Sequence, residues 1–369
     1  MSKPGLASFF AIVSNAVDGD IAVFRVDGST GGIERVGRHA AADSVMPMAL
    51  SSDCRVLHAA TRGVHRSIVT YSVDSDTGHL THVRTAAIEA SLAYLSLTPH
   101  DDWLLGASYG ESSVSLYRAG ASENDALMPR QVIDGIQHAH AVIASADGRY
   151  AYATSLGSDT VYCFAIVRDE SANDAALELV QKLSVEPGFG PRHLRFSPDE
   201  KTLYVSSEFR ATVAVFARER DSGRLSARSV APRAPALAHL NDGCVRSAQI
   251  DAQTAASLIW AADFQVTPCG HFVYVAERTS SRLIAYRVGS DGALDYAGFT
   301  DTEAQPRGFR IDPSGRFLVA CGERSPHVAV YAIDANSGAL AAVSRCEGGQ
   351  GANWIEIVPQ TWRSGGAAP

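Results

Sequence analysis

The sequence predicts an all-β fold, a seven-bladed β-propeller that makes up a single domain. Three observations predict it. A motif of two apolar strands joined by a short polar turn recurs along the chain at intervals of 45 to 52 residues, with one longer interval of 70. Two further strands follow each copy, and four antiparallel strands per ~45 residues are typical of a propeller blade. The chain also starts and finishes partway through a unit, as expected for a ring closed by its two ends.

The repeated motif supplies the first two strands of each blade. Clear copies are LRFSPDEKTLYVSS from Leu194, FQVTPCGHFVYVAE from Phe264 and FRIDPSGRFLVACG from Phe309. Apolar residues alternate with period two on both sides of a turn rich in Pro, Asp, Ser and Gly, which indicates two strands joined by a tight turn. Together with three weaker copies, the motif has six turns, which begin at the following positions: Ser51, Thr98, Ser145, Ser197, Thr267 and Asp312.

The third strand of each unit is a short run rich in Val and aromatic residues, such as VAVFAR from Val213 and VAVYAI from Val328. A polar turn, such as DSDTGHL or DANSGAL, then leads to the fourth strand. The interval of 70 residues contains an insertion, at about 227–257, which is rich in Ala, Asp and Gln. We expect this insertion to form either a lid over one face of the ring or an inert surface loop.

The two ends of the chain are predicted to share the first blade. The sequence opens with the strands FFAIVSN from Phe9 and IAVFRV from Ile21, and NWIEIVPQ from Asn353 matches only the first strand of a unit. Pairing of this last strand with the first blade closes the ring and leaves no open seam between blades. Six full units and this split unit give seven blades in one domain, residues 1–362. The tail that follows, 363–369, is predicted to be disordered.

Composition and charge exclude several classes of protein. With 32 basic and 40 acidic residues the formal net charge is −8, so a nucleic-acid binder, which needs a basic face, is not expected. No apolar run approaches the ~20 residues needed to span a membrane, and the N-terminal residues lack a signal-peptide pattern. The six cysteines are scattered without a CxxC pair, which predicts reduced thiols in a cytoplasmic protein.

Two rings of side chains are expected around one mouth of the central channel. The first strand of each blade lines the channel, so equivalent repeat positions meet there. Both rings are counted from the third residue of each turn, which is Asp199 in the fifth unit. The first ring stands seven residues before this residue, at Arg192, and the second ring stands nine residues after it, at Glu208. Because the first two strands form a hairpin, both rings lie at the end opposite the turns. The rings hold nine polar or charged residues: Arg62, Tyr109, His140, Arg192, Glu208, Arg278, Arg307, Glu323 and Asn353.

The composition of these rings favours a small anionic ligand, because four arginines against two glutamates make the mouth locally positive. His193 and Asp263 stand one position beyond a ring, where strand alternation is expected to point them away from it as supporting or packing residues. Phosphate-binding Gly-Lys loops and the HExxH motif do not occur. We therefore expect no metal ion and no cofactor.

Several motifs carry a family resemblance over nearly the whole chain, from about Phe9 to Pro359. GPRHLRFSP, YVSSE, WAADFQVTPCG, AERTSS and QPRGFRIDPSGRF resemble the seven-bladed lactonase family, and most closely the bacterial propeller-type 6-phosphogluconolactonases. The same family contains fungal carboxy-cis,cis-muconate cyclases, whose site is a cluster of His, Arg and Glu. The resemblance implies four catalytic residues, all of which also belong to the predicted rings: His140, Arg192, Glu208 and Arg278.

The function implied is hydrolysis of a small anionic lactone. The simplest case is hydrolysis of 6-phospho-D-glucono-1,5-lactone to 6-phosphogluconate in the pentose phosphate pathway. We expect the protein to be a monomer. Arg192 and Arg278 are suited to stabilise the developing oxyanion, because a guanidinium stays charged and forks onto planar oxygens. Either Glu208 or His140 acts as the general base toward water, and the other donates the proton to the leaving oxygen. The remaining ring residues are assigned to substrate binding, with Arg307 or Arg62 holding a phosphate or carboxylate: Arg62, Tyr109, Arg307, Glu323 and Asn353.

Two alternatives remain at this point. A cyclase-type lactonising enzyme would bind the carboxylates of a muconate with the same arginines and move the proton with His140 or Glu208. A non-catalytic propeller would bind a ligand or partner at the rings and turn over no lactone.

Overall fold

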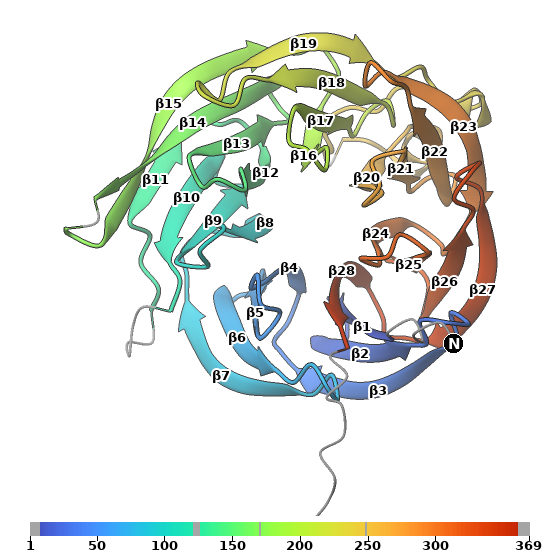
Figure 1. The fold of residues 1–369 in the computed structure, drawn as a ribbon, viewed down its shortest axis with the longest axis horizontal. Coiled ribbons are helices and arrows are strands. Elements are labelled where there is room, and N and C mark those ends of the chain that lie inside the picture. Colours follow the sequence, from blue (N-terminus) through green and yellow to red (C-terminus); the bar gives the residue numbers. More distant parts are fainter. Residues whose placement is uncertain (1–7, 121–125, 170, 248, 361–369) are drawn as a thin grey trace, which may run out of the picture.

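The computed structural model describes residues 8–120, 126–169, 171–247 and 249–360 of the chain. They form seven four-stranded antiparallel sheets arranged in a ring around a central channel (Figure 1). This confirms the predicted seven-bladed β-propeller. The predicted disordered tail, 363–369, lies outside the described residues.

The strands of the first four blades run outward from the channel as follows. The first blade contains β28 (Ala352–Pro359), β1 (Phe9–Asn15), β2 (Asp20–Val26) and β3 (Ile33–Ala40). The second contains β4 (Val45–Leu50), β5 (Val56–Thr61), β6 (Ser67–Val73) and β7 (Leu80–Ala87). The third contains β8 (Leu92–Leu97), β9 (Trp103–Ser108), β10 (Ser113–Arg118) and β11 (Gln131–Asp134). The fourth contains β12 (Ala139–Ala144), β13 (Tyr150–Ser155), β14 (Thr160–Asp169) and β15 (Asp174–Ser184).

The last three blades repeat the pattern. The fifth contains β16 (Pro191–Phe196), β17 (Thr202–Ser207), β18 (Val213–Arg218) and β19 (Leu225–Val230). The sixth contains β20 (Ala261–Val266), β21 (Phe272–Glu277), β22 (Arg282–Val288) and β23 (Leu294–Asp301). The seventh contains β24 (Pro306–Ile311), β25 (Phe317–Gly322), β26 (His327–Ile333) and β27 (Leu340–Glu347).

The apolar core lies between neighbouring blades. Strands β1 and β9 are buried along their whole length, whereas the outermost strand β3 alternates between exposed and half-buried residues. Phe164 of β14 and Phe216 of β18 belong to one cluster, so the side chains of one blade pack on the next. This explains why the inner strands read as apolar runs, since both of their faces are covered.

The C-terminal strand closes the ring. β28 pairs antiparallel with β1, with Phe9 opposite Pro359 and Ser14 opposite Trp354. This pairing confirms the prediction that the last strand joins the first blade, and Figure 1 shows β28 on the channel side of β1.

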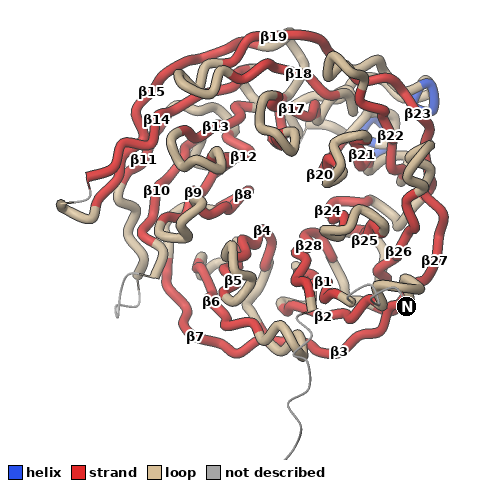
Figure 2. The backbone as a smooth tube through the Cα atoms, in the orientation of Figure 1, coloured by secondary structure: helices blue, strands red, loops and turns tan. Residues whose placement is uncertain are grey.

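A long connection links the fifth and sixth blades. Strand β19 continues to Val230, which pairs with Ala214 of β18, so the connection starts a few residues later than the sequence suggested. It contains the short helical segments η1 (Pro235–Leu237) and α1 (Ala252–Ala255), which are blue in Figure 2. No helix in the described part of the chain is long and apolar enough to cross a membrane.

Candidate active site

The hairpin geometry of the blades brings the two predicted rings together at one mouth. Arg192 stands near the start of β16, and Glu208 directly follows β17, whose Ser207 pairs with Pro191. The Glu208 N–H donates to the Gly190 carbonyl at 2.8 Å, which fixes this end of the hairpin. The turn between β16 and β17 therefore lies at the other mouth of the channel.

A pocket of about 200 Å³ lies at the mouth that carries the rings. It is lined by seven of the nine predicted residues together with Ala93 and Arg246: Arg62, Tyr109, His140, Arg192, Glu208, Arg278 and Arg307. We call this hollow the core pocket. Residues from the second to the seventh blade thus meet around one small space, although they lie far apart in the sequence.

Two predicted residues lie outside the lining of the core pocket. Glu323 pairs with Arg307, whose Nη1 lies 2.5 Å from Glu323 Oε1. Asn353 is buried, and its amide nitrogen donates to the carbonyls of Gly351 and Val45 at 2.9 and 3.2 Å. Its position therefore serves the closure of the first blade, because both of its N–H groups are engaged by backbone.

Glu208 joins two arginines at the centre of the core pocket. It accepts hydrogen bonds from Arg192 Nε at 3.0 Å and from Arg278 Nη2 at 2.8 Å. All three side chains are buried. Burial alone would raise the pKa of Glu208, but the charges of Arg278 and Arg192 outweigh it and hold the pKa below its usual value. Glu208 is therefore ionised, and each of its oxygens is occupied.

Each arginine keeps one nitrogen available. Arg192 also donates from Nη1 to His193, and Arg278 donates from Nε to the Trp260 carbonyl at 2.9 Å. Within the described residues, Nη2 of Arg192 and Nη1 of Arg278 have no hydrogen-bond partner. Burial lowers the pKa of Arg192 to about 9, which still leaves it charged at neutral pH. The pair can therefore donate to an oxyanion while Glu208 holds both guanidinium groups in place.

His140 is the one histidine that lines the core pocket among the described residues. Its Nε2 lies 3.9 Å from Glu208 Oε2, and its buried Nδ1 has no hydrogen-bond partner in the described part of the chain. Burial, and then the charge of Arg192, hold the pKa of His140 well below its usual value. His140 is therefore a neutral imidazole with a lone pair available to accept a proton.

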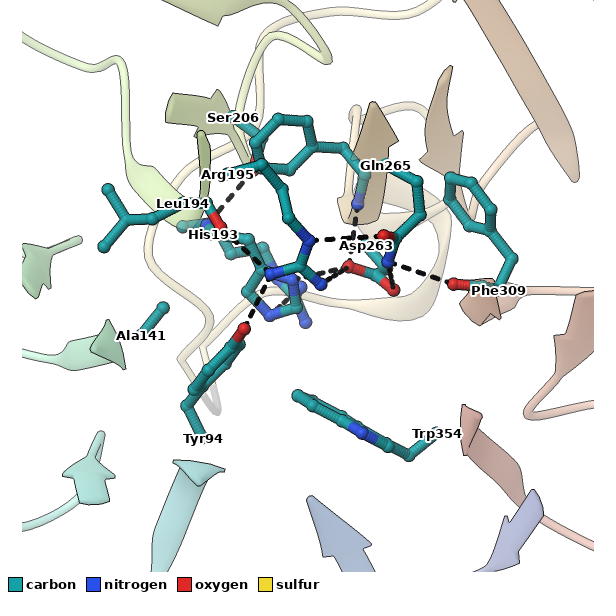
Figure 3. Close-up of polar contacts among 12 residues, drawn as sticks. Tyr94, Ala141, His193, Leu194, Arg195, Ser206, Asp263, Gln265, Phe309 and Trp354 are labelled. Atoms are coloured by element: carbon teal, nitrogen blue, oxygen red, sulfur yellow. Dashed lines mark hydrogen bonds and ion pairs between the residues drawn. The ribbon is translucent and has the colours of Figure 1, made fainter. Parts of the chain in front are cut away.

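A buried network supports Arg192, and Figure 3 shows its part around His193 and Asp263. Arg192 Nη1 lies 2.8 Å from His193 Nε2, and His193 Nδ1 lies 2.9 Å from Asp263 Oδ1. Because a guanidinium only donates, Nε2 of His193 accepts and Nδ1–H donates to Asp263. Asp263 is held in turn by Arg195 Nη2 and Gln265 Nε2. This chain fixes the tautomer of His193 and the orientation of Arg192.

The contact between Arg192 and His193 departs from simple strand alternation, which was expected to point His193 away from the ring. The register shifts between Pro191 and Leu194, so that Arg192 and His193 together oppose the single residue Ser206. Such a β-bulge re-aims side chains. The register shifts at the same place in β4, β12 and β20, so the bulge is a feature of the repeat.

The buried neutral state of His193 predicts a pH-dependent stability. Burial and the charge of Arg192 lower the pKa of His193 to about 3, against 6.5 in an unfolded chain. Between these values the unfolded chain binds a proton that the folded protein does not, so the free energy of unfolding falls as the pH drops below 6.5, by about 1.4 kcal/mol per pH unit. In urea denaturation between pH 7.5 and 5, the free energy of unfolding should fall less steeply with decreasing pH for His193→Asn than for the unchanged protein. Parallel dependences would contradict this prediction.

Arg246 lines the core pocket but was not among the predicted site residues. It lies in the connection between the fifth and sixth blades, with its guanidinium carbon 4.6 Å from the centre of the Trp260 ring. The repeat has no equivalent position for it, so comparison of blades cannot find it. The one signal in the sequence is a basic residue inside an insertion.

No group of three or more His, Cys, Asp or Glu side chains that could hold a metal ion occurs among the described residues.

Comparisons with known proteins agree with this architecture. Residues 9–357 match the family model described as "Lactonase, 7-bladed beta-propeller". The chain is 30% identical over 317 residues to a protein of Enterobacter sp. named 6-phosphogluconolactonase. It is 31% identical over 317 residues to a protein of the same name from Pectobacterium carotovorum. Each match covers 85% of this chain and 88% of the relative. Among solved structures, the Pseudomonas aeruginosa periplasmic gluconolactonase shares the fold, with a TM-score of 0.80 and 24% identity over 96% of this chain and 100% of that one. The chain is therefore a lactonase that belongs to the seven-bladed β-propeller lactonase family.

Proposed function

We propose that this lactonase hydrolyses a sugar-acid lactone, 6-phospho-D-glucono-1,5-lactone, to 6-phosphogluconate, with the core pocket as its active site. The observation that carries the proposal is a neutral, buried His140 whose Nε2 lies 3.9 Å from Glu208, the carboxylate that two arginines share. A base and two oxyanion donors around one small space are what ester hydrolysis by water requires. The names of the two bacterial relatives support the choice of substrate.

In the proposed mechanism, His140 accepts a proton from water as the water oxygen attacks the lactone carbonyl carbon. The carbonyl oxygen becomes an oxyanion that receives N–H groups from Arg192 and Arg278. Collapse of the tetrahedral intermediate breaks the bond to the ring oxygen, which leaves as a hydroxyl with the proton from His140. The product carboxylic acid then releases one proton to solvent.

This assignment makes His140 the base and Glu208 a positioning residue. The structural reason is that both oxygens of Glu208 already accept hydrogen bonds from guanidinium groups. His140, by contrast, faces Glu208 through Nε2 at 3.9 Å, which is beyond hydrogen-bond distance, so this nitrogen is unengaged in the described part of the chain.

The test is hydrolysis of freshly prepared 6-phosphogluconolactone, followed by proton release in a pH-stat and corrected for the spontaneous reaction. We expect the protein to accelerate it far beyond that background, since enzymes typically reach ~10⁶-fold or more. Unphosphorylated glucono-1,5-lactone and carboxy-cis,cis-muconate serve as comparison substrates. Conversion of the muconate without hydrolysis of either sugar lactone would replace the proposal by a lactonising cyclase, and no turnover of any of them would refute it.

We also propose a place in the pentose phosphate pathway and in the cytoplasm. All six cysteines are thiols in the structure, which supports a reducing compartment. Closure of the ring by β28 supports a monomer, because the first blade is completed by the chain's own last strand and needs no strand from a partner.

A further inference from the structure

A second hollow adjoins the core pocket. It has a volume of about 470 Å³, and two of its lining residues, Arg246 and Arg278, also line the core pocket. The connection between the fifth and sixth blades forms one wall, and the sixth and seventh blades form the other. We call this hollow the side pocket.

The size of the core pocket makes the side pocket relevant to the substrate. Ligand pockets usually measure ~300–1,000 Å³. The core pocket, at about 200 Å³, is smaller than that range and suits little more than a lactone ring. A substituent on the ring that points toward Arg246 and Arg278 therefore enters the side pocket.

The charge of the side pocket indicates what the substituent is. Its lining contains Arg246, Arg278 and Arg324 and no acidic residue. Arg278 is neutralised by Glu208, but neither Arg246 nor Arg324 lies within 4.0 Å of a carboxylate in the described part of the chain. Two arginines that form no ion pair among the described residues, beside the proposed active site, favour an anionic group.

The sequence suggested a different place for this anion, at Arg307 or Arg62. Arg307 is already paired with Glu323 at 2.5 Å. Arg62 donates from Nε to Ser91 Oγ at 3.1 Å, and its Nη1 lies 3.2 Å from Met46 Sδ. Arg62 carries no carboxylate partner, so it is the competitor that an experiment must separate from the side pocket.

Arg246 is presented by a well-anchored segment. The Gly243 N–H donates to the Phe209 carbonyl at 2.7 Å, directly after Glu208. A Cβ at Gly243 would come within 2.2 Å of the Ile259 carbonyl oxygen, so only glycine permits this approach. Trp260, on which Arg246 lies, is held by its Nε1–H donating to the Ala255 carbonyl at 3.0 Å. The guanidinium is thus placed by the connection itself.

We propose that the side pocket is an anion subsite, in which Arg246 and Arg324 bind a phosphate or carboxylate group at the end of the lactone remote from its carbonyl. This inference rests on the proposed function and deepens it. It also assigns a role to the connection between the fifth and sixth blades, which selects substrates that carry a terminal negative charge.

The test measures binding of reaction products by isothermal titration calorimetry, which needs no turnover. The probes are gluconate, 6-phosphogluconate and glucarate, which carry a terminal hydroxyl, phosphate and carboxylate. We expect the unchanged protein to bind a terminally charged probe at least about tenfold more tightly than gluconate, and Arg246→Gln and Arg324→Gln each to remove about tenfold of that preference. Binding of gluconate should not change in Arg324→Gln, because Arg324 lines the side pocket and not the core pocket. The probe with the larger preference identifies the phosphate or the carboxylate as the natural group.

The matched control is Arg287→Gln, which removes an exposed arginine that lies over Phe272 at 4.8 Å, outside both pockets. Equal binding of the three probes by the unchanged protein would overturn the inference. So would loss of the preference in Arg62→Gln but not in Arg246→Gln. Because these outcomes concern binding, they stay separate from a failure of 6-phosphogluconolactone hydrolysis, which would refute the proposed function alone.

Discussion

Replacing His140 by alanine should lower kcat for lactone hydrolysis by about 10²–10⁴-fold while KM changes little, because general base catalysis contributes about that much. The side chain acts on the attacking water, so its loss removes an interaction made in the transition state rather than in the bound substrate. Steady-state kinetics with the proton-release assay give both constants. Added imidazole should restore part of the rate, since it can enter the space that the side chain leaves.

The control is His58→Ala. His58 is also a buried histidine, but its Nδ1 lies 3.0 Å from Thr70 Oγ1 within the second blade, away from the core pocket. We expect its kcat to match that of the unchanged protein. If His140→Ala kept a full kcat, or lost only affinity, His140 would not be the base.

The lowered pKa of His140 also predicts the pH profile. The imidazole must be neutral to accept a proton, and its pKa lies well below 6.5. Activity should therefore stay level from pH 8 down to 6.5 and fall only at more acidic pH, where His140 becomes protonated. A decline centred at 6.5 would indicate a solvent-exposed histidine instead.

Replacing Glu208 by glutamine should have the largest effect on stability. Arg192 and Arg278 would lose the shared charge that compensates their burial, and removal of one partner from a buried ion pair costs about 3 kcal/mol or more. The same change should lower kcat, because the two guanidinium groups would no longer be held toward the carbonyl. Urea denaturation and steady-state kinetics of the variant measure the two effects.

Glu323→Gln is the matched control, since Glu323 occupies the equivalent ring position in the seventh blade. It pairs with one arginine, and about a quarter of its side chain is exposed, at 27%. Ion pairs with solvent access contribute at most about 1 kcal/mol, so the loss should be much smaller. Equal losses in the two variants would show that Glu208 is not the electrostatic centre of the site.

Much of the fold could be predicted because its signals are local. Strands such as β17 and β25 are short, mainly apolar runs bounded by turn residues, and both features depend on neighbours in the sequence. The repeat then placed His140 and Arg192 at one ring position, and Glu208 and Arg278 at the other. The structure brings these four residues into one pocket.

Other features could not be predicted because they depend on contacts between distant segments. The bulge that turns His193 toward Arg192 changes no residue pattern, and Asn353 occupies a ring position but donates to the carbonyls of Gly351 and Val45. Arg246 belongs to a segment that no blade repeats. The sequence by itself determined the number of blades and the ring positions, because turns and alternation are encoded within a few residues. Only the tertiary structure decided which ring residues touch and which are protonated, because burial and the approach of charges arise when segments some 70 residues apart, such as His193 and Asp263, come into contact.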